Sequence, residues 1–315
     1  MTNDTPNETT CVAASEGRSM IGTVDHVDGW LLLEAPGRWG AQWHDAEAVD
    51  AGLRQQIEAL LAAAAAEGLK LRPQLVKQQA VRGQRVLLLA HERLWLLAGG
   101  LRALKESPAT GLSTLFRAAK EAPATAVRAA GGQLQALSEP QYFVCTNGQR
   151  DRCCGALGMP LYRALSAAVQ QRAWQISHVG GHRFAPNVLV TPGALLYGRV
   201  APAVVERFLA AVEGGCVAFD WLRGRSSYPP LVQAAEAFLA RQGLELVAVE
   251  SAGTEPERGR VVFSAGAEQL AIDVGRSSET EAVLASCGAP TLKSYSPFAT
   301  RPSSGATGSG RGSRA

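Results

Sequence analysis

The fold is decided by residues 141–182, QYFVCTNGQRDRCCGALGMPLYRALSAAVQQRAWQISHVGGH. The apolar segment 141–146 predicts a β-strand, and the apolar segment 173–179 predicts a second one. Between them, residues 155–171 predict an amphipathic helix. The apolar face of this helix is formed by Leu161, Leu165, Ala168 and Val169.

The segments that follow complete a recognisable order of elements. Residues 187–200 predict a β-hairpin that turns at Pro192–Gly193, and residues 202–215 predict a helix that ends at Gly214. Strand, helix, strand, hairpin and helix on one small sheet is the order of a thioredoxin-like fold, so the fold class is α/β (α+β).

The first half of the chain repeats most of this order without the clustered cysteines. Its predicted strands lie in the apolar segments 29–36, 72–79 and 85–100, and a predicted helix carries Leu53, Ile57, Leu60 and Leu61. Residues 101–138 are rich in helix formers but interrupted by proline and glycine, which predicts a helical linker. The similarity rests on element order, and it suggests a weak internal duplication.

The predicted domains follow from this reading. We expect a flexible N-terminus at 1–20, an N-terminal thioredoxin-like half at 21–135, a second thioredoxin-like domain at 136–297 and a disordered tail at 298–315. The second domain carries the clustered cysteines and includes a C-terminal appendage of one helix and short strands.

Composition excludes several classes of function. The chain has 315 residues and a net charge of +3, so nothing favours binding to nucleic acid or to an anionic membrane. It contains no apolar run of about 20 residues, and its start lacks the pattern of a secretory signal. Six unevenly spaced cysteines do not form a secreted disulfide framework, so we expect a reduced, cytoplasmic protein.

Cys145, Cys153 and Cys154 lie within ten positions, and His178 and His182 follow in HVGGH. A tyrosine-phosphatase loop needs five residues between cysteine and arginine, whereas four separate Cys145 from Arg150. A thioredoxin-like dithiol needs two residues between its cysteines. Cys153 and Cys154 are adjacent, and Cys145 lies too far upstream of both. Ordinary structural cysteines and histidines remain possible for each residue taken alone.

The cysteine pair Cys145 and Cys154 and the histidine pair His178 and His182 nevertheless fall at the ends of neighbouring predicted strands. Cys145 ends one strand, Cys154 opens the helix after it, and His178 ends the next strand. Two thiolates and two imidazoles suit zinc or an iron-sulfur centre. Zinc-finger cysteines are usually two to four residues apart, and the longer loop here favours a [2Fe-2S] cluster.

The segments CTNGQRDRCCG and SHVGGHRFAPNVLV resemble the sucrase/ferredoxin-like family, in particular its Apd1-type thioredoxin-fold [2Fe-2S] proteins. The family pattern is Cys, eight residues, Cys, then His-x-x-x-His. The resemblance implies that Cys145 and Cys154 bind one iron and that His178 and His182 bind the other. Two features depart from the pattern. Cys153 offers an alternative thiolate, and Pro186 stands where a small residue is expected.

The sequence therefore predicts a one-electron carrier with a [2Fe-2S] cluster bound by two cysteines and two histidines. It favours an electron carrier over an enzyme. Its redox partner, a reductase or an electron acceptor, is not identified by the residues. The alternatives are a thioredoxin-like thiol oxidoreductase that uses Cys153 or Cys154, and a zinc-stabilised structural module. The sucrase activity in the family name has no support, because no pair of carboxylates suggests glycoside hydrolysis.

Overall fold

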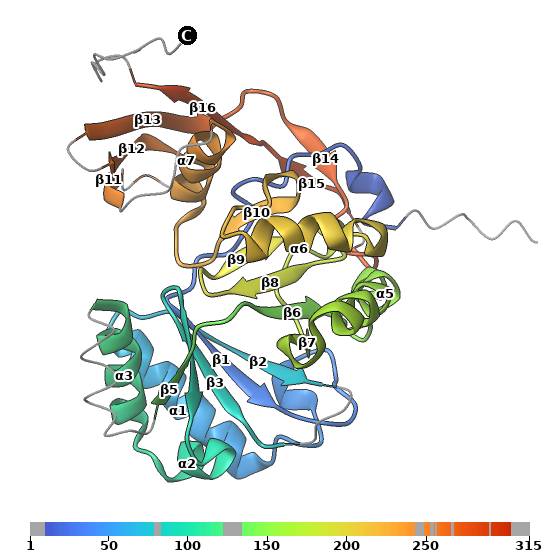
Figure 1. Ribbon diagram of the computed structural model, residues 1–315, viewed down its shortest axis with the longest axis vertical. Helices are drawn as coiled ribbons and strands as arrows, with labels where there is room; N and C mark the ends of the chain where they lie inside the picture. The colour runs from blue at the N-terminus through green and yellow to red at the C-terminus, as the bar shows by residue number, and fades with distance from the viewer. Residues whose placement is uncertain are drawn as a thin grey trace, which may run out of the picture.

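The computed structural model describes residues 10–78, 83–121, 134–242, 249–252, 255, 257–265, 268–289 and 291–303. Its main feature is a curled ten-stranded sheet with the order β10-β9-β8-β6-β7-β2-β1-β3-β4-β5 (Figure 1). Strands from both halves of the chain join in this sheet, since β2 pairs with β7 antiparallel. The chain is therefore built around a single continuous sheet.

Within the described ranges, the first half supplies five strands and three α-helices. The bounds are β1 (Gly29–Glu34), α1 (Ala51–Ala66), β2 (Leu71–Lys77), β3 (Val86–Ala90), β4 (Arg93–Leu97), α2 (Gly100–Glu106), α3 (Ala109–Glu121) and β5 (Leu134–Leu137). Two helices and a strand thus occupy the region for which a helical linker was predicted, and its residues 122–133 lie outside the described part. The Asp50 side chain caps α1 by accepting the Leu53 N–H at 2.7 Å.

The second half supplies the other five strands. The bounds are β6 (Gln141–Cys145), α5 (Arg152–Val169), β7 (Ala173–Ile176), β8 (Val188–Thr191), β9 (Leu195–Tyr197), α6 (Val205–Glu213) and β10 (Leu222–Arg225). The predicted strand, helix, strand, hairpin and helix are all present, which confirms the thioredoxin-like α+β fold class. Helix α5 begins at Arg152, three residues earlier than predicted, and Ala168 is exposed, so its place on the buried face was wrong.

The two halves have the same strand topology. In each half the first strand pairs parallel with the second and antiparallel with the third, as β1 does with β2 and β3 and β6 does with β7 and β8. The strands β3, β4 and β5 then follow antiparallel, as do β8, β9 and β10. The two halves therefore share their strand pairing as well as the order of their elements.

Alternation along the strands sends side chains into separate cores. Leu31 and Leu33 of β1 pack under α1, α2 and α3, whereas Trp30 and Leu32 face a core shared by both halves. That shared core also contains Phe143 and Cys145. Helices α5 and α6 cover a third core on the second half. Cys145 thus lies in the core where the two halves meet.

The C-terminal appendage forms two small sheets of its own (Figure 1). Its elements are α7 (Pro230–Arg241), β11 (Val249–Ala252), β12 (Arg258–Ala265), β13 (Glu268–Arg276), β14 (Glu281–Val283), β15 (Lys293–Tyr295) and β16 (Phe298–Pro302). Strand β16 pairs with β13, so residues 298–302 are not part of a disordered tail; residues 304–315 lie outside the described part. None of the helices in the described ranges has the length and apolarity needed to cross a membrane.

The N-terminal segment also differs from the expected flexible end. Residues 1–9 lie outside the description, but residues 10–20 pack against the second half. The Cys11 side chain is fully buried, and a short 3-10 helix, η1 (Ala13–Ser15), follows it. Arg199 fixes this segment by donating to the carbonyl oxygens of Ser15 and Arg18, the latter at 2.9 Å.

Candidate metal or iron-sulfur centre

The four predicted ligands lie at one edge of the main sheet. Strands β6 and β7 are parallel neighbours, and Cys145, the last residue of β6, pairs with Ile176, the last residue of β7. The carboxyl ends of parallel strands meet at one edge, so the loops that follow them meet as well. Cys154 lies in the first turn of α5, and His178 and His182 lie in the loop after β7.

Measured contacts connect these side chains. Cys154 Sγ lies 3.4 Å from His182 Nδ1, and the rings of His178 and His182 stack with centroids 4.6 Å apart and planes 20° apart. The Cys145 thiol interacts with both Cys154 and His178. Pairwise contacts therefore connect the two sulfur and two imidazole groups, and the ligand atoms of Cys154, His182 and Asp151 lie within 4.8 Å of one another.

The group is asymmetric in its exposure. Cys145 and Cys154 are buried in the core shared by the two halves. His178 and His182 are both partly exposed, although Nδ1 of His178 is buried and has no hydrogen-bond partner within the described part of the chain. A buried ring nitrogen without a partner is costly in a native structure, and binding to a metal is one way to satisfy it. The sulfur side thus faces the interior and the imidazole side faces the surface.

The two thiols have opposite electrostatic environments. The hydrogen bond from the Cys154 thiol lowers the pKa of Cys145 well below its ordinary value, against the effect of burial, and the His178 imidazole lowers that pKa further. The same hydrogen bond raises the pKa of Cys154, and burial raises it too. This environment favours a thiolate at Cys145, which is the metal-binding form of cysteine.

His182 is held in its neutral form. Burial, followed by the nearby charge of His178, lowers the pKa of His182 to about 4. A neutral imidazole has a lone pair available for a metal, whereas an imidazolium does not. The charge state of His182 at neutral pH therefore suits a ligand.

The loop between Cys145 and Cys154 is shaped by two polar side chains. Asp151 caps α5 because its carboxylate accepts the Cys153 N–H at 2.8 Å, and Asn147 Oδ1 accepts the Gln149 N–H at 3.1 Å. The amide of Asn147 also donates to the Gly40 carbonyl oxygen at 2.9 Å, which fixes the loop to the first half. Both side chains thus have structural roles, Asp151 as a helix cap and Asn147 in a turn.

The loop that carries the histidines is held from beneath by Arg223. This side chain is fully buried, and its Nη1 donates to the Gly180 carbonyl oxygen and to Asn187 Oδ1, both at 2.9 Å. Gly181 has a φ of +71°, and a Cβ there would lie 2.2 Å from Arg223 Nη2. Glycine is thus required next to His182 both by the backbone and by the close guanidinium.

The structure shows where the two residues that depart from the family pattern, Cys153 and Pro186, lie. Cys154 points toward His182, whereas the Cys153 sulfur lies 3.7 Å from Cys11 Sγ and 3.1 Å from Cys287 Sγ. Pro186 follows a cis peptide bond and lies beyond the short helix η4 (His182–Phe184). Neither feature removes any of the four side chains from the group.

Sequence reasoning missed Arg223, which is more deeply buried than the arginines next to the predicted ligands in the sequence. Arg150 and Arg152 are exposed, while Arg183 stacks over Phe184 at 4.5 Å, so none of them is buried like Arg223. The signal that could have found Arg223 is its place beside Trp221 and Leu222 in an apolar segment that forms β10. A charged residue within a buried strand usually has a structural or functional partner.

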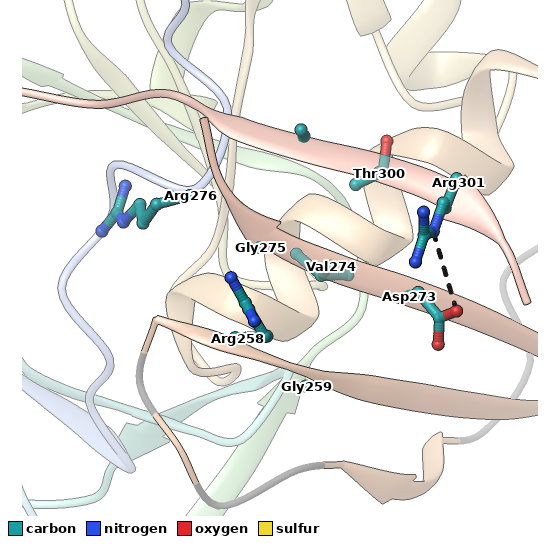
Figure 2. A pocket seen from close by; sticks show the side chains of 9 residues that line it. Arg258, Gly259, Asp273, Val274, Gly275, Arg276, Thr300 and Arg301 are labelled. Carbon is teal, nitrogen blue, oxygen red and sulfur yellow. Dashed lines mark ion pairs between the residues drawn. The ribbon is translucent and has the colours of Figure 1, made fainter. Parts of the chain in front are cut away.

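A separate hollow of about 470 Å³ lies on the four-stranded sheet of the appendage (Figure 2). Strands β12, β13 and β16 line it, and Arg301 Nε lies 3.8 Å from Asp273 Oδ2 across its floor. It shares no residue with the group formed by the two cysteines and two histidines. Its exposed arginines and single carboxylate indicate no particular chemistry.

Comparison with known proteins adds an independent observation. A family model described as sucrase/ferredoxin-like matches residues 20–224, about two thirds of the chain. The protein named "Altered inheritance of mitochondria protein 32" is 32% identical over 101 residues in Meyerozyma guilliermondii and 29% identical over 97 residues in Candida glabrata. These alignments cover 29% and 26% of this chain and 36% and 31% of the relatives. No solved structure matches the chain significantly.

Proposed function

Because the chain belongs to the sucrase/ferredoxin-like family, we propose that it is an electron-transfer protein with one [2Fe-2S] cluster bound by Cys145, Cys154, His178 and His182. The observation that carries the proposal is the convergence of two thiols and two imidazoles, with Cys154 Sγ 3.4 Å from His182 Nδ1. When bound, such a cluster supplies a site that accepts and releases one electron.

The donor set fits this cofactor. Cys145 is surrounded by groups that favour its thiolate, and His182 is neutral at pH 7. His178 Nδ1 is buried and has no hydrogen-bond partner among the described residues, so this nitrogen is free to bind a metal. Replacing two thiolates by neutral imidazoles removes two negative charges, so we expect a reduction potential well above the roughly −400 mV of plant-type ferredoxins.

The exposure pattern supports exchange of electrons through the histidine side. The sulfur ligands are shielded by the core between the two halves, while the imidazoles reach the surface. We propose that the redox partner, a reductase or an electron acceptor, approaches the surface formed by residues 178–183. We also propose a cytoplasmic location, since all six thiols are unpaired. Cell fractionation that recovers the chain from an oxidising compartment would contradict that location.

The proposal is tested by purifying the protein without air, recording its visible spectrum, and assaying iron and acid-labile sulfide. Two irons and two sulfides per chain, with absorption that bleaches on reduction by dithionite, support the cluster. A colourless protein without iron overturns it. Activity with disulfide substrates would then favour the thiol oxidoreductase, and zinc bound through these four residues would favour the structural module.

Variants assign the ligands. His178→Ala and His182→Ala are expected to abolish the visible absorption and the iron content, because each removes a ligand. His91→Asn is a matched control, since His91 lies in the β3–β4 turn and asparagine tolerates its positive φ of 52°. Retention of two irons and an unchanged spectrum in both site variants would overturn the proposed ligand set.

A further inference from the structure

Three cysteines meet in a second group, next to the first but separate from it. Cys11 comes from the N-terminal segment, Cys153 from the first turn of α5 and Cys287 from the segment between β14 and β15. Their sulfurs are separated by 3.7 Å (Cys11 and Cys153), 3.5 Å (Cys11 and Cys287) and 3.1 Å (Cys153 and Cys287). No pair among them forms a disulfide.

A carboxylate completes this group. The oxygens of Asp151 lie 3.8 and 3.9 Å from Cys11 Sγ. They accept the Cys153 N–H at 2.8 Å and the Cys287 N–H at 2.9 Å, so the carboxylate is fixed in place by two of the residues whose sulfurs it faces. One ligand atom from each of the four residues lies within 4.8 Å of all the others.

The spacing matches a tetrahedral zinc site. With Zn–S bonds of about 2.3 Å, two sulfurs on one zinc are about 3.8 Å apart. The separations of Cys11 from Cys153 (3.7 Å) and from Cys287 (3.5 Å) lie close to that value, and the 3.1 Å between Cys153 and Cys287 would have to widen on binding. Cys11 and Cys153 are almost completely shielded from solvent, and the Cys287 side chain is partly buried. Four protein ligands and no open position are typical of structural rather than catalytic zinc.

We propose that Cys11, Cys153, Cys287 and Asp151 bind one Zn²⁺ ion. On binding, the three thiols release their protons to solvent, the carboxylate binds as it is, and no atom changes oxidation state. The resulting site carries a net negative charge. Arg152 and Arg199 line the same hollow as Cys153, together with Glu16, so the charged side chains of this hollow sum to one positive charge.

The zinc ties together three segments that are distant in the chain. The ligands are separated by 142, 134 and 276 positions, so a single ion links the N-terminal segment, the start of α5 and the appendage. Cys153 is adjacent to Cys154, and Asp151 also lies within 4.8 Å of the ligand atoms of Cys154 and His182. The zinc thereby fixes the helix start that carries one of the four residues of the first group.

The test uses the full-length protein purified without air, with zinc and iron measured on the same sample. We expect one zinc per chain. X-ray absorption at the zinc edge should show three sulfurs at about 2.3 Å and one oxygen. Two sulfurs and two nitrogens around the zinc would place it at the first group and overturn the proposal, as would the absence of zinc. This measurement needs no variant.

Variants separate the two groups. Cys11→Ser and Cys287→Ser should lose the zinc but keep the iron, whereas His178→Ala should lose the iron but keep the zinc. Cys216→Ser is the control, because Cys216 is exposed and outside both groups. Zinc that disappears with His178→Ala, or a Cys153–Cys287 disulfide found by mass spectrometry in the anaerobic protein, contradicts the assignment. Failure of the cluster proposal would leave unchanged the zinc that is lost with Cys11→Ser and Cys287→Ser, so the two failures are distinguishable.

Discussion

The buried guanidinium of Arg223 donates from Nη1 to the carbonyl oxygen of Gly180, at 2.9 Å, within the loop that carries both histidines. Its other partners among the described residues are the side chains of Asn187 and Thr23 and the Thr23 carbonyl oxygen. All of these acceptors are uncharged. Burial, followed by the charge of Arg183, lowers the pKa of Arg223 to about 10, so it remains protonated at neutral pH. Among the described residues, Arg223 thus donates no hydrogen bond to a carboxylate, and its positive charge lies beneath the histidine loop.

Arg223→Gln is expected to lower both the stability of the protein and the reduction potential of the proposed cluster. The substitution removes a charge that favours the reduced centre, and it leaves buried acceptors without donors, at a cost of about 1–3 kcal/mol in the free energy of unfolding. Potentiometric titration and urea unfolding measure the two effects. Arg223→Lys keeps the charge but not the planar fork, so it should lose stability with a smaller change in potential. Equal potentials in wild type and Arg223→Gln would refute an electrostatic role.

Gly181→Ala is expected to displace His182 and reduce the iron content. The new Cβ would lie 2.2 Å from Arg223 Nη2, and the fully buried guanidinium has little freedom to move away. Gly68→Ala is a matched control, because Gly68 has a similar φ of +74° with nothing within 4 Å of a Cβ. Both variants carry a backbone strain of about 1 kcal/mol, whereas the clash affects Gly181→Ala alone. Iron content and melting temperature of the two proteins, measured together, isolate the contact; similar values in both would count against it.

The sequence was sufficient to predict that Cys154 and His182 lie close together, because the segments that carry them follow β6 and β7, which are parallel neighbours. It was also sufficient for most helices and strands of both halves, but not for β5, for β10 or for the division of residues 101–138 into separate elements. It was not sufficient for the group around Cys153. Cys11 and Cys287 are 276 positions apart, and no local pattern reveals that the two ends of the chain pack against the start of α5. Such contacts depend on the path of the whole chain.

The repeated topology shows why the chemistry resides in the second half. Cys145 ends β6 opposite Ile176, and the matching position at the end of β1 is Glu34, opposite Val76. Glu34 is buried and bound by Arg85, whose Nη2 lies 2.7 Å from Oε1. The same place in the fold thus holds an ion pair in one half and a thiol in the other. Two halves with one topology carry different chemistry because side chains at the strand ends differ.

We expect the protein to lose stability in acid when Asp28, the residue before β1, is protonated. Burial alone would raise the pKa of Asp28, but hydrogen bonds from Lys120 and from the Lys70 N–H, at 2.8 Å, lower it below its ordinary value. A carboxyl whose pKa is lower in the folded state stabilises the protein above the unfolded pKa of about 3.9, and this contribution disappears as the pH falls through the folded pKa.

Asp28→Asn should therefore reduce the free energy of unfolding at pH 7 by about 1–3 kcal/mol, and the difference from wild type should shrink below pH 4. Urea unfolding between pH 7 and pH 3 measures this convergence. Asp25→Asn is the control, because the Asp25 side chain is 69% exposed and lies 3.4 Å from its partner Arg72. A wild-type to Asp28→Asn difference that stays constant down to pH 3 would disprove the linkage.

Close packing between α5 and β6 sets the position of both cysteines of the proposed cluster. A Cβ on Gly158 would lie 2.0 Å from the carbonyl oxygen of Cys145, so the helix approaches the strand end as closely as glycine allows. Gly158→Ala is expected to push α5 away from β6, increase the separation of Cys145 and Cys154, and lower both iron content and melting temperature.

The matched control is Gly111→Ala in α3, where a Cβ meets nothing within 4 Å. Alanine there should leave the iron unchanged and raise the stability by about 0.5–1 kcal/mol, because it favours the helix over glycine. If Gly158→Ala binds iron and melts like Gly111→Ala, the helix can move without disturbing the ligands, and the tight approach of α5 to Cys145 does not position them.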